Sequence, residues 1–472
     1  MSKQSAPKLT QRPVLPTLFA MALPMLGGTF AMNAFNLTDT WFVAQLGTLP
    51  LAAMGFSFPV VMFLGSITRG LGTGATAVVS HALGRHDEEL AKRITTHTMI
   101  LAALVVACVS IGGLLTMNAV FTMLGAETGI LPLIREYMTI WYLSVAFMVF
   151  PMMASDILRA TGDTVSPSLV MVLSSVLNMI LDPIMIFGWF GFPPMGIRGA
   201  ALATLLSMAV SCIVVLWILI HRHHLLLLEI PSWRAMLASW QEVLNIGLPS
   251  SFSNILVPIS GAVITRMVAQ YGEAAVAACS AASRIEMFAF MIPMALGVSL
   301  VPFVGQNYGA NRLDRVKGGQ RYSYGFAFVF GIVIAIIFSI FSDHLARLFS
   351  QDQQVLSVLN CYLSIIPLGY GMMEIHRYSG FFLNGIKKPL HSTGVNAMRI
   401  LGFLIPLSFL GGQFFGIEGI FWGRAIADIL AGCGGMIWAN TILNRIIYQT
   451  RIQERQYYEA KETPIELPLH DA

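Results

Sequence analysis

The sequence predicts an all-α integral membrane protein, with twelve transmembrane helices in two pseudo-symmetric six-helix lobes. Three observations predict this fold class: the composition, the length and number of the apolar runs, and an internal repeat. The residue types AVILMFWYC make up 56% of the 472 residues, and Asp, Glu, Lys and Arg together only 11%, whereas soluble domains are about 25% charged. A soluble core of this length cannot bury so many apolar side chains, so lipid is the expected solvent. The small net charge of +4 argues against a nucleic-acid partner.

Twelve apolar runs are long enough to cross a bilayer, which takes about 20 helical residues. They lie roughly at 14–42, 52–80, 95–117, 135–158, 167–190, 197–220, 242–269, 277–304, 322–343, 358–383, 392–412 and 417–442. Several contain a proline, which membrane helices tolerate where neighbours satisfy the freed carbonyl. Pro24 removes a backbone donor and crowds the carbonyl of Ala20, so we expect a bend there that acts as a conformational hinge.

Basic residues predict the orientation of these helices. Nineteen of the 28 lysines and arginines fall in the N-terminal segment, in the connections after even-numbered runs and in the C-terminal segment, and only Arg135, Arg198 and Arg347 fall on the other side. Because cytoplasmic loops are rich in Lys and Arg, we expect a multi-pass protein of the cytoplasmic (inner) membrane with both termini in the cytoplasm.

The two halves of the chain are related by an internal repeat. A shift of 225 residues places Leu23-Pro24 on Leu248-Pro249, and Val43-Ala44-Gln45 on Val268-Ala269-Gln270. Because each half holds an even number of helices, the halves have the same orientation. Parallel repeats of this kind occur in secondary transporters, with the substrate between them.

The repeat sets the predicted domain boundaries. We expect a first lobe over 1–220 that carries a cation site, a cytoplasmic linker over 221–241, a second lobe over 242–445 and a cytoplasmic tail over 446–472.

Two intramembrane carboxylates lack a basic residue within one turn of their own helix. Asp39 stands near the outer end of the first helix, and Asp182 near that of the fifth, with Asn178 one turn before it. Thr204 in the sixth helix comes to a similar depth. Ionisable groups inside a membrane are costly and are functional candidates by default. The repeat equivalent of Asp39 is Ile264, so we expect the ion chemistry in the first lobe only.

Other membrane charges have a partner nearby in sequence. Asp156 with Arg159 and Arg424 with Asp428 are spaced to pair on one helix face and are interpreted as structural pairs. Glu374 with Arg377 is a third such pair and is the candidate for lining a cavity in the second lobe. The run Gly70-x-Gly72-x-Gly74 predicts a close helix contact rather than a nucleotide loop.

Five segments in order carry a family resemblance. They are Pro24 with Asp39, GRHDEELAKR (84–93), RATGDTVSP (159–167), LNMILDP (177–183) and GIRGAALAT (196–204). With these segments the chain resembles the multidrug and toxic compound extrusion (MATE) family, in particular its DNA-damage-inducible F-type bacterial branch. The resemblance implies a V of two lobes that extrudes amphipathic, often cationic compounds in exchange for protons or sodium ions.

The resemblance also implies the coupling residues. Asp39, Asn178, Asp182 and Thr204 match the first-lobe cation site of that branch, and Ala200 falls where the branch can offer a backbone carbonyl. Other branches usually have an acidic residue in the seventh helix, whereas residues 247–271 contain none.

The expected coupling ion is the proton, with sodium as the alternative. Two carboxylates at one depth in a low-dielectric lobe disfavour double ionisation, which favours binding of a proton. Sodium would instead be held by the hard oxygen donors of Asp182, Asn178, Thr204 and Ala200. We expect no cofactor, no metal and no catalytic residue.

Other functions are less compatible with the sequence. A flippase for a lipid-linked oligosaccharide is the main alternative, but it would need several unpaired basic residues in its cavity. An intramembrane aspartyl protease also uses two carboxylates, yet its YD and GxGD signatures are absent. No GxxxxGK[ST] phosphate loop occurs, so we expect no nucleotide partner. The expected partners are small-molecule drugs or toxins and the bilayer, with the protein a monomer.

Overall fold

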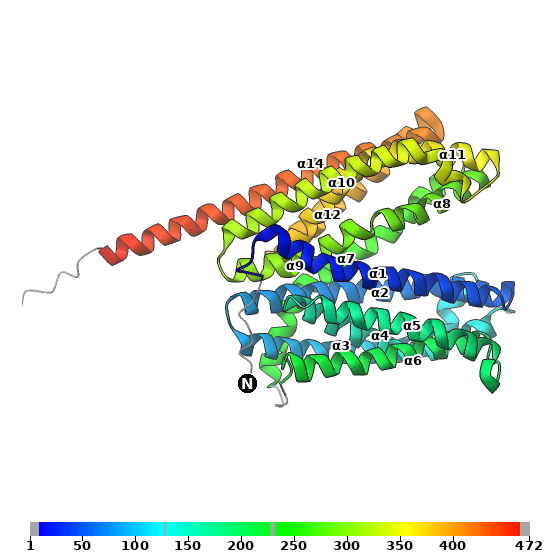
Figure 1. Ribbon diagram of the computed structural model, residues 1–472, viewed down its shortest axis with the longest axis horizontal. Coiled ribbons are helices and arrows are strands. Elements are labelled where there is room, and N and C mark those ends of the chain that lie inside the picture. Colours follow the sequence, from blue (N-terminus) through cyan, green and yellow to red (C-terminus); the bar gives the residue numbers. More distant parts are fainter. Residues whose placement is uncertain (1–8, 127–128, 228–231, 463–472) are drawn as a thin grey trace, which may run out of the picture.

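The computed structural model describes residues 9–126, 129–227 and 232–462, and this part of the chain is helical without a strand. Figure 1 shows two helical bundles that lie together at one end and diverge toward the other. The first bundle holds α1 (Val14–Ala44), α2 (Thr48–Gly84), α3 (Glu88–Met123), α4 (Leu131–Ala160), α5 (Val165–Phe187), η1 (Trp189–Gly191), α6 (Ile197–Trp217) and the π-helical η2 (Ile218–Arg222). The all-helical, two-lobed fold class predicted from the sequence is confirmed.

The second bundle begins inside the predicted linker. It holds α7 (Trp233–Ala269), α8 (Glu273–Ala289), α9 (Met291–Gly309), α10 (Leu313–Arg347), α11 (Gln353–Ile365), η3 (Ile366–Gly369), α12 (Tyr370–Gly385), α13 (Pro389–Ala397), the π-helical η4 (Met398–Leu404) and α14 (Ile405–Glu462). The last helix therefore continues well into the predicted tail.

Ten helical segments are long and apolar enough to cross a membrane, and α8 with α9 forms one further span bent by 55°. The segment Pro389–Gln453 is about 65 residues long, several times the length that one span requires. It folds back at Gly416, because a Cβ on Gly411 would lie 2.0 Å from the carbonyl oxygen of Gly419, which places residues on either side of Gly416 in contact. It therefore supplies two spans, and the described residues hold twelve.

A matching turn joins the last two helices of each lobe. Gly196 has φ 55° and ψ −133°, and Gly416 has φ 63° and ψ −147°, a conformation that favours glycine. Three residues later, Gly199 and Gly419 bring the following helix against a backbone carbonyl of the preceding one. The same sequence pattern thus builds the same helical hairpin twice.

The first helix of each repeat reaches into the opposite lobe. Leu18, Ala22 and Met25 of α1 belong to a buried cluster formed mainly by α9, α10 and α12. Val243 and Ile246 of α7 belong to the main cluster of the first lobe. The lobes therefore share core residues near one end.

Glycines close that end of the molecule. A Cβ on Gly74 would lie 2.4 Å from the carbonyl oxygen of Val243, and one on Gly84 would lie 2.1 Å from that of Gln306. The predicted close helix contact of α2 is therefore confirmed. The connections at this end, after α2 and after α9, carry many of the basic residues that predict the cytoplasmic side.

Candidate functional site

Asp39 and Asp182 are both buried, on two helices of the first lobe that pack against each other, α1 and α5. One turn further along each helix, Val43 and Ile186 form a small buried cluster with Ala200 of α6. Ala200 in turn lies one turn before Thr204. The three helices therefore direct Asp39, Asp182 and Thr204 to one region, and the two carboxylates interact electrostatically.

Asn178 links two of these residues. With its amide oriented to satisfy its neighbours, Nδ2 donates to Oδ2 of Asp182 at 2.9 Å, and Oδ1 accepts from the Thr204 hydroxyl at 3.3 Å. Asn178 itself is buried. The structure thus brings together Asn178, Asp182 and Thr204, as the sequence predicts.

Asp39 has an unsatisfied oxygen. Its Oδ1 is buried and has no hydrogen-bond partner among the described residues. A buried carboxylate without partners is unfavourable while it is ionised, unless a proton or another cation joins it. The arrangement can therefore bind a cation. That Ala200 contributes its carbonyl as a ligand stays a prediction.

Tyr137 of α4 is a neighbour that sequence reasoning missed. Its hydroxyl group is close enough to Asp39 and Asp182 to interact electrostatically with both carboxylates. Tyr137 lies on a fourth helix, and no local spacing relates it to either carboxylate. Only the packing of the lobe identifies it.

Pro24 lies where α1 passes from one lobe to the other. α1 is one continuous helix around it, and a bend there stays a prediction. On one side of Pro24, Leu18 and Ala22 pack in the second lobe. On the other, Gly28 approaches Ser168 of α5 so closely that a Cβ would lie 3.1 Å from its Cα atom.

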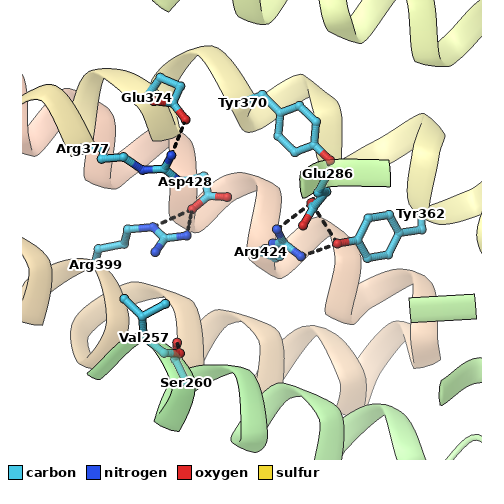
Figure 2. A network of polar contacts seen from close by, with 10 residues as sticks. All are labelled: Val257, Ser260, Glu286, Tyr362, Tyr370, Glu374, Arg377, Arg399, Arg424 and Asp428. Carbon is cyan, nitrogen blue, oxygen red and sulfur yellow. Dashed lines mark hydrogen bonds and ion pairs between the residues drawn. The ribbon is translucent and has the colours of Figure 1, made fainter. Parts of the chain in front are cut away.

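The second lobe contains a network of ion pairs, shown in Figure 2. Oε1 of Glu286 accepts from Nη2 of Arg424 at 2.7 Å, from Tyr370 at 2.7 Å and from Tyr362 at 2.9 Å. The guanidinium of Arg424 also donates to the hydroxyl of Tyr362. Three protein donors therefore converge on one oxygen of this carboxylate.

Two further arginines complete the network (Figure 2). Arg399 contacts Oδ1 of Asp428 through Nε at 2.8 Å and Nη2 at 2.7 Å. Arg377 lies with Nη1 2.9 Å from Oε1 of Glu374, as the sequence predicts. Arg424 and Asp428, however, do not form the expected pair, because each has a partner on another helix.

A cavity of about 730 Å³ lies beside this network. Its lining includes one unpaired arginine, Arg69 of α2, and the three paired ones, with Glu286 as the one carboxylate among the lining residues. Glu374 and Asp428 are fully buried behind their arginines. Arg377 thus lines the predicted second-lobe cavity, whereas Glu374 does not.

Comparisons with known proteins bear on both lobes. A family model described as MatE matches residues 24–184 and 249–410, so the two matched regions begin 225 residues apart, in agreement with the internal repeat. A FAD transporter of Shewanella oneidensis is 36% identical, over 90% of this chain and 94% of that protein. A probable multidrug resistance protein of Bacillus subtilis is 26% identical, over 95% of this chain and 100% of that protein.

A solved structure agrees in fold. The MATE transporter VcmN of Vibrio cholerae, in a bent form, superposes with a TM-score of 0.86 at 31% identity, and the alignment covers 91% of this chain and 97% of that one.

Proposed function

This chain belongs to the MatE family, a family of membrane transporters rather than enzymes, and we propose that it is a secondary active exporter driven by cation entry at Asp39 and Asp182. The observation that carries this proposal is the buried Oδ1 of Asp39, which has no hydrogen-bond partner in the described part of the chain. It lies near a second carboxylate that already accepts from Asn178.

The proton is the proposed coupling ion. With both carboxylates ionised, their mutual repulsion in a low-dielectric site is unfavourable, and one proton relieves it. A proton that enters from outside neutralises one of the two carboxylates, relieves their repulsion and lets the helices pack more closely. Its loss to the cytoplasm restores the charge and resets the cycle.

Sodium is the alternative ion for the same site. It would be held by Asp182, Asn178, the Thr204 hydroxyl and the Ala200 carbonyl, which are all hard oxygen donors. A monovalent cation needs most of these donors at once. Proton binding needs only a carboxylate, so the two ions predict different losses when Thr204 or Asn178 is replaced.

Alternating access is proposed to move the substrate between the lobes. The two lobes are in contact at the end that carries the basic connections, where Gly74 and Gly84 of α2 lie against α7 and α9. They diverge at the other end (Figure 1). If the basic end is cytoplasmic, this conformation faces outward. Both termini would then lie inside, and we propose that the protein works as a monomer of the inner membrane. Strong labelling from outside intact cells of a cysteine placed at the exposed Arg312 would contradict this orientation.

The substrates are proposed to be amphipathic, and relatives name two kinds. The B. subtilis relative is named for multidrug resistance, which corresponds to the often cationic compounds that the family resemblance implies. The S. oneidensis relative is named a FAD transporter. A FAD cargo is a second candidate, favoured by the arginines of the cavity. A FAD cargo would conflict with the expectation of no nucleotide partner. That expectation rests only on the absence of a GxxxxGK[ST] phosphate loop.

A lipid-linked oligosaccharide flippase is the remaining alternative. Its polyanionic cargo would need several unpaired basic groups, whereas three of the four cavity arginines have carboxylate partners.

Transport by purified protein in liposomes tests the proposal. The vesicles are loaded with ethidium or with FAD, and a proton gradient alone and a sodium gradient alone are imposed in turn. We expect export under the proton gradient. Export under sodium alone would change the ion, and export of neither cargo under either gradient would contradict antiport.

A further inference from the structure

We propose that the second-lobe cavity binds the anionic group of an amphipathic organic anion, through the guanidinium groups of Arg69, Arg377 and Arg399. This inference rests on the proposed export function and names its substrate class. The group recognised is a phosphate or a carboxylate, the two anions that arginine side chains bind through paired N–H donors.

The cavity wall carries far more positive than negative charge. Arg69, Arg377, Arg399 and Arg424 all line it, against one carboxylate, Glu286. Arg69 has no ion-pair or hydrogen-bond partner among the described residues, and its guanidinium lies against Gly65 of its own helix. An anion that enters here meets at least one guanidinium with all its donors available.

The one carboxylate among the described lining residues, Glu286, is already paired with an arginine. Oε1 of Glu286 is occupied by Arg424 and by the hydroxyls of Tyr362 and Tyr370. Glu374 and Asp428 are fully buried and are not part of the lining. Three of the four lining arginines are compensated by carboxylates, and Arg69 remains as an uncompensated positive charge that disfavours a cation.

Arg377 and Arg399 each pair with a buried carboxylate and still have N–H groups that can donate to a ligand. Nη1 of Arg377 is 2.9 Å from Oε1 of Glu374, yet neither oxygen of Glu374 has a hydrogen-bond partner in the part of the chain that the structure describes. This contact is thus a charge pair with poor hydrogen-bond geometry. Arg399 uses Nε and Nη2 on a single oxygen of Asp428, and the other oxygen, Oδ2, has no partner within the described ranges. The buried carboxylates neutralise the arginines without using all their N–H groups.

The local backbone supports the same site. Arg399 lies on the π-helical segment η4, a rare conformation that often occurs at functional sites.

The rest of the lining accommodates the apolar part of such an anion. Met62, Met294, Phe381 and Phe421 contribute apolar surface from four different helices. Methionine and aromatic side chains adapt to varied flat or irregular ligands. The volume of about 730 Å³ lies within the range of roughly 300–1,000 Å³ that small-molecule sites occupy.

The direct test compares cargoes of opposite charge. Carboxyfluorescein supplies carboxylates, and ethidium is the cation. Methylumbelliferyl phosphate supplies a phosphate and is detected as fluorescent methylumbelliferone after phosphatase treatment of the samples. Export from liposomes under a proton gradient and equilibrium binding to detergent-solubilised protein are both measured. We expect saturable binding and export of at least one anion. The preference between the two anions decides whether a carboxylate or a phosphate is recognised.

Matched variants connect the effect to the cavity. Arg69→Gln, and the double variant Arg377→Gln with Glu374→Gln that leaves no unpaired buried charge, should each weaken anion binding by about tenfold, the effect of losing one charged hydrogen bond. Arg377→Lys should retain part of the binding. Arg284→Gln, an exposed arginine outside the cavity, should bind like the wild type.

The outcomes separate this inference from the proposed function. Export of ethidium alone, insensitive to the Arg69 and Arg377 variants, would overturn the anion site and leave antiport standing. Absence of saturable binding of both anions would also overturn it. Anion export that persists without any proton or sodium gradient would instead contradict the proposed coupling while the binding site stands.

Discussion

Leu18 and Val243 are repeat equivalents 225 residues apart, and each is buried in the core of the opposite lobe. The first helix of each repeat therefore crosses between the lobes. In α1 the crossing lies just after Pro24, between Met25, which packs in the second lobe, and Gly28, which lies against α5. A change at Asp39 can thus alter how α1 bridges the two lobes.

Replacement of Pro24 tests whether this crossing acts as a hinge. Pro24→Ala restores a backbone donor and removes the ring that crowds Ala20, so we expect a stiffer α1 and slower export with unchanged binding of protein to its cargo. Transport rates in liposomes measure the effect. Pro59→Ala, in α2, is the matched control. Export by Pro24→Ala at the wild-type rate would exclude a working hinge.

The two carboxylates should be individually essential. Asp39→Asn and Asp182→Asn each replace one carboxylate by a neutral amide and remove the mutual repulsion that favours proton binding, so both should abolish coupled export. Dye efflux under a proton gradient is the measurement. Asp343→Asn, which alters an exposed carboxylate of α10, should export normally. Full activity of either intramembrane variant would refute the site.

The ligands around Asp182 distinguish the two ions. Asn178→Leu removes the donor to Oδ2 of Asp182, and Thr204→Val removes a hydroxyl. A hydrogen bond to a charged group contributes about 1.5–3 kcal/mol, so a proton-coupled exporter should slow by about tenfold and still work. Complete loss in both variants, together with sodium-driven export in the wild type, would establish sodium.

The ion pair of Glu286 and Arg424 should stabilise the second lobe. Removal of one partner from a fully buried pair costs about 3–5 kcal/mol, because the other charge is left without compensation. The side chains of Arg424 and Glu286 are 19% and 13% exposed, so the cost here should be smaller. We therefore expect Arg424→Met to lower the thermal midpoint of the purified protein markedly. The double variant with Glu286→Gln should recover much of that loss. Equal midpoints for the single variant and the wild type would contradict this role.

The loop between α4 and α5 should respond to acid. Burial alone would raise the pKa of Asp163, but hydrogen bonds from His223 and Ser166 outweigh burial and hold its pKa well below the ordinary value of 3.8. A lowered folded-state pKa stabilises the folded loop above the ordinary pKa, and this stabilisation is lost as the pH falls through the folded value.

Hydrogen exchange of residues 221–227, corrected for intrinsic rates, measures this prediction. Protection due to Asp163 should be constant from neutral pH down to about pH 5 and decline below about pH 4. Asp163→Asn should lack this decline and show weaker protection at neutral pH. Identical protection in the two proteins would show that the contact between His223 and Asp163 does not hold the linker.

The sequence by itself determined the twelve spans, the repeat and the two carboxylates without local partners. Each of these features depends on neighbours along the chain: a run of about 20 apolar residues, a constant offset of 225, or the absence of Lys and Arg within a turn of Asp39 and Asp182. Asn178 could be predicted for the same reason, since it lies one turn from Asp182.

Only the tertiary structure decided which groups meet across helices. Arg424 and Asp428 are correctly spaced for a pair, yet Arg424 pairs with Glu286 and Asp428 with Arg399. Such contacts depend on the depth of each helix in the membrane and on its rotation about its own axis. The packing of side chains from distant segments determines both the depth and the rotation. For the same reason Tyr137 was missed beside the carboxylates, and the gathering of four arginines around one cavity emerged only from the folded chain.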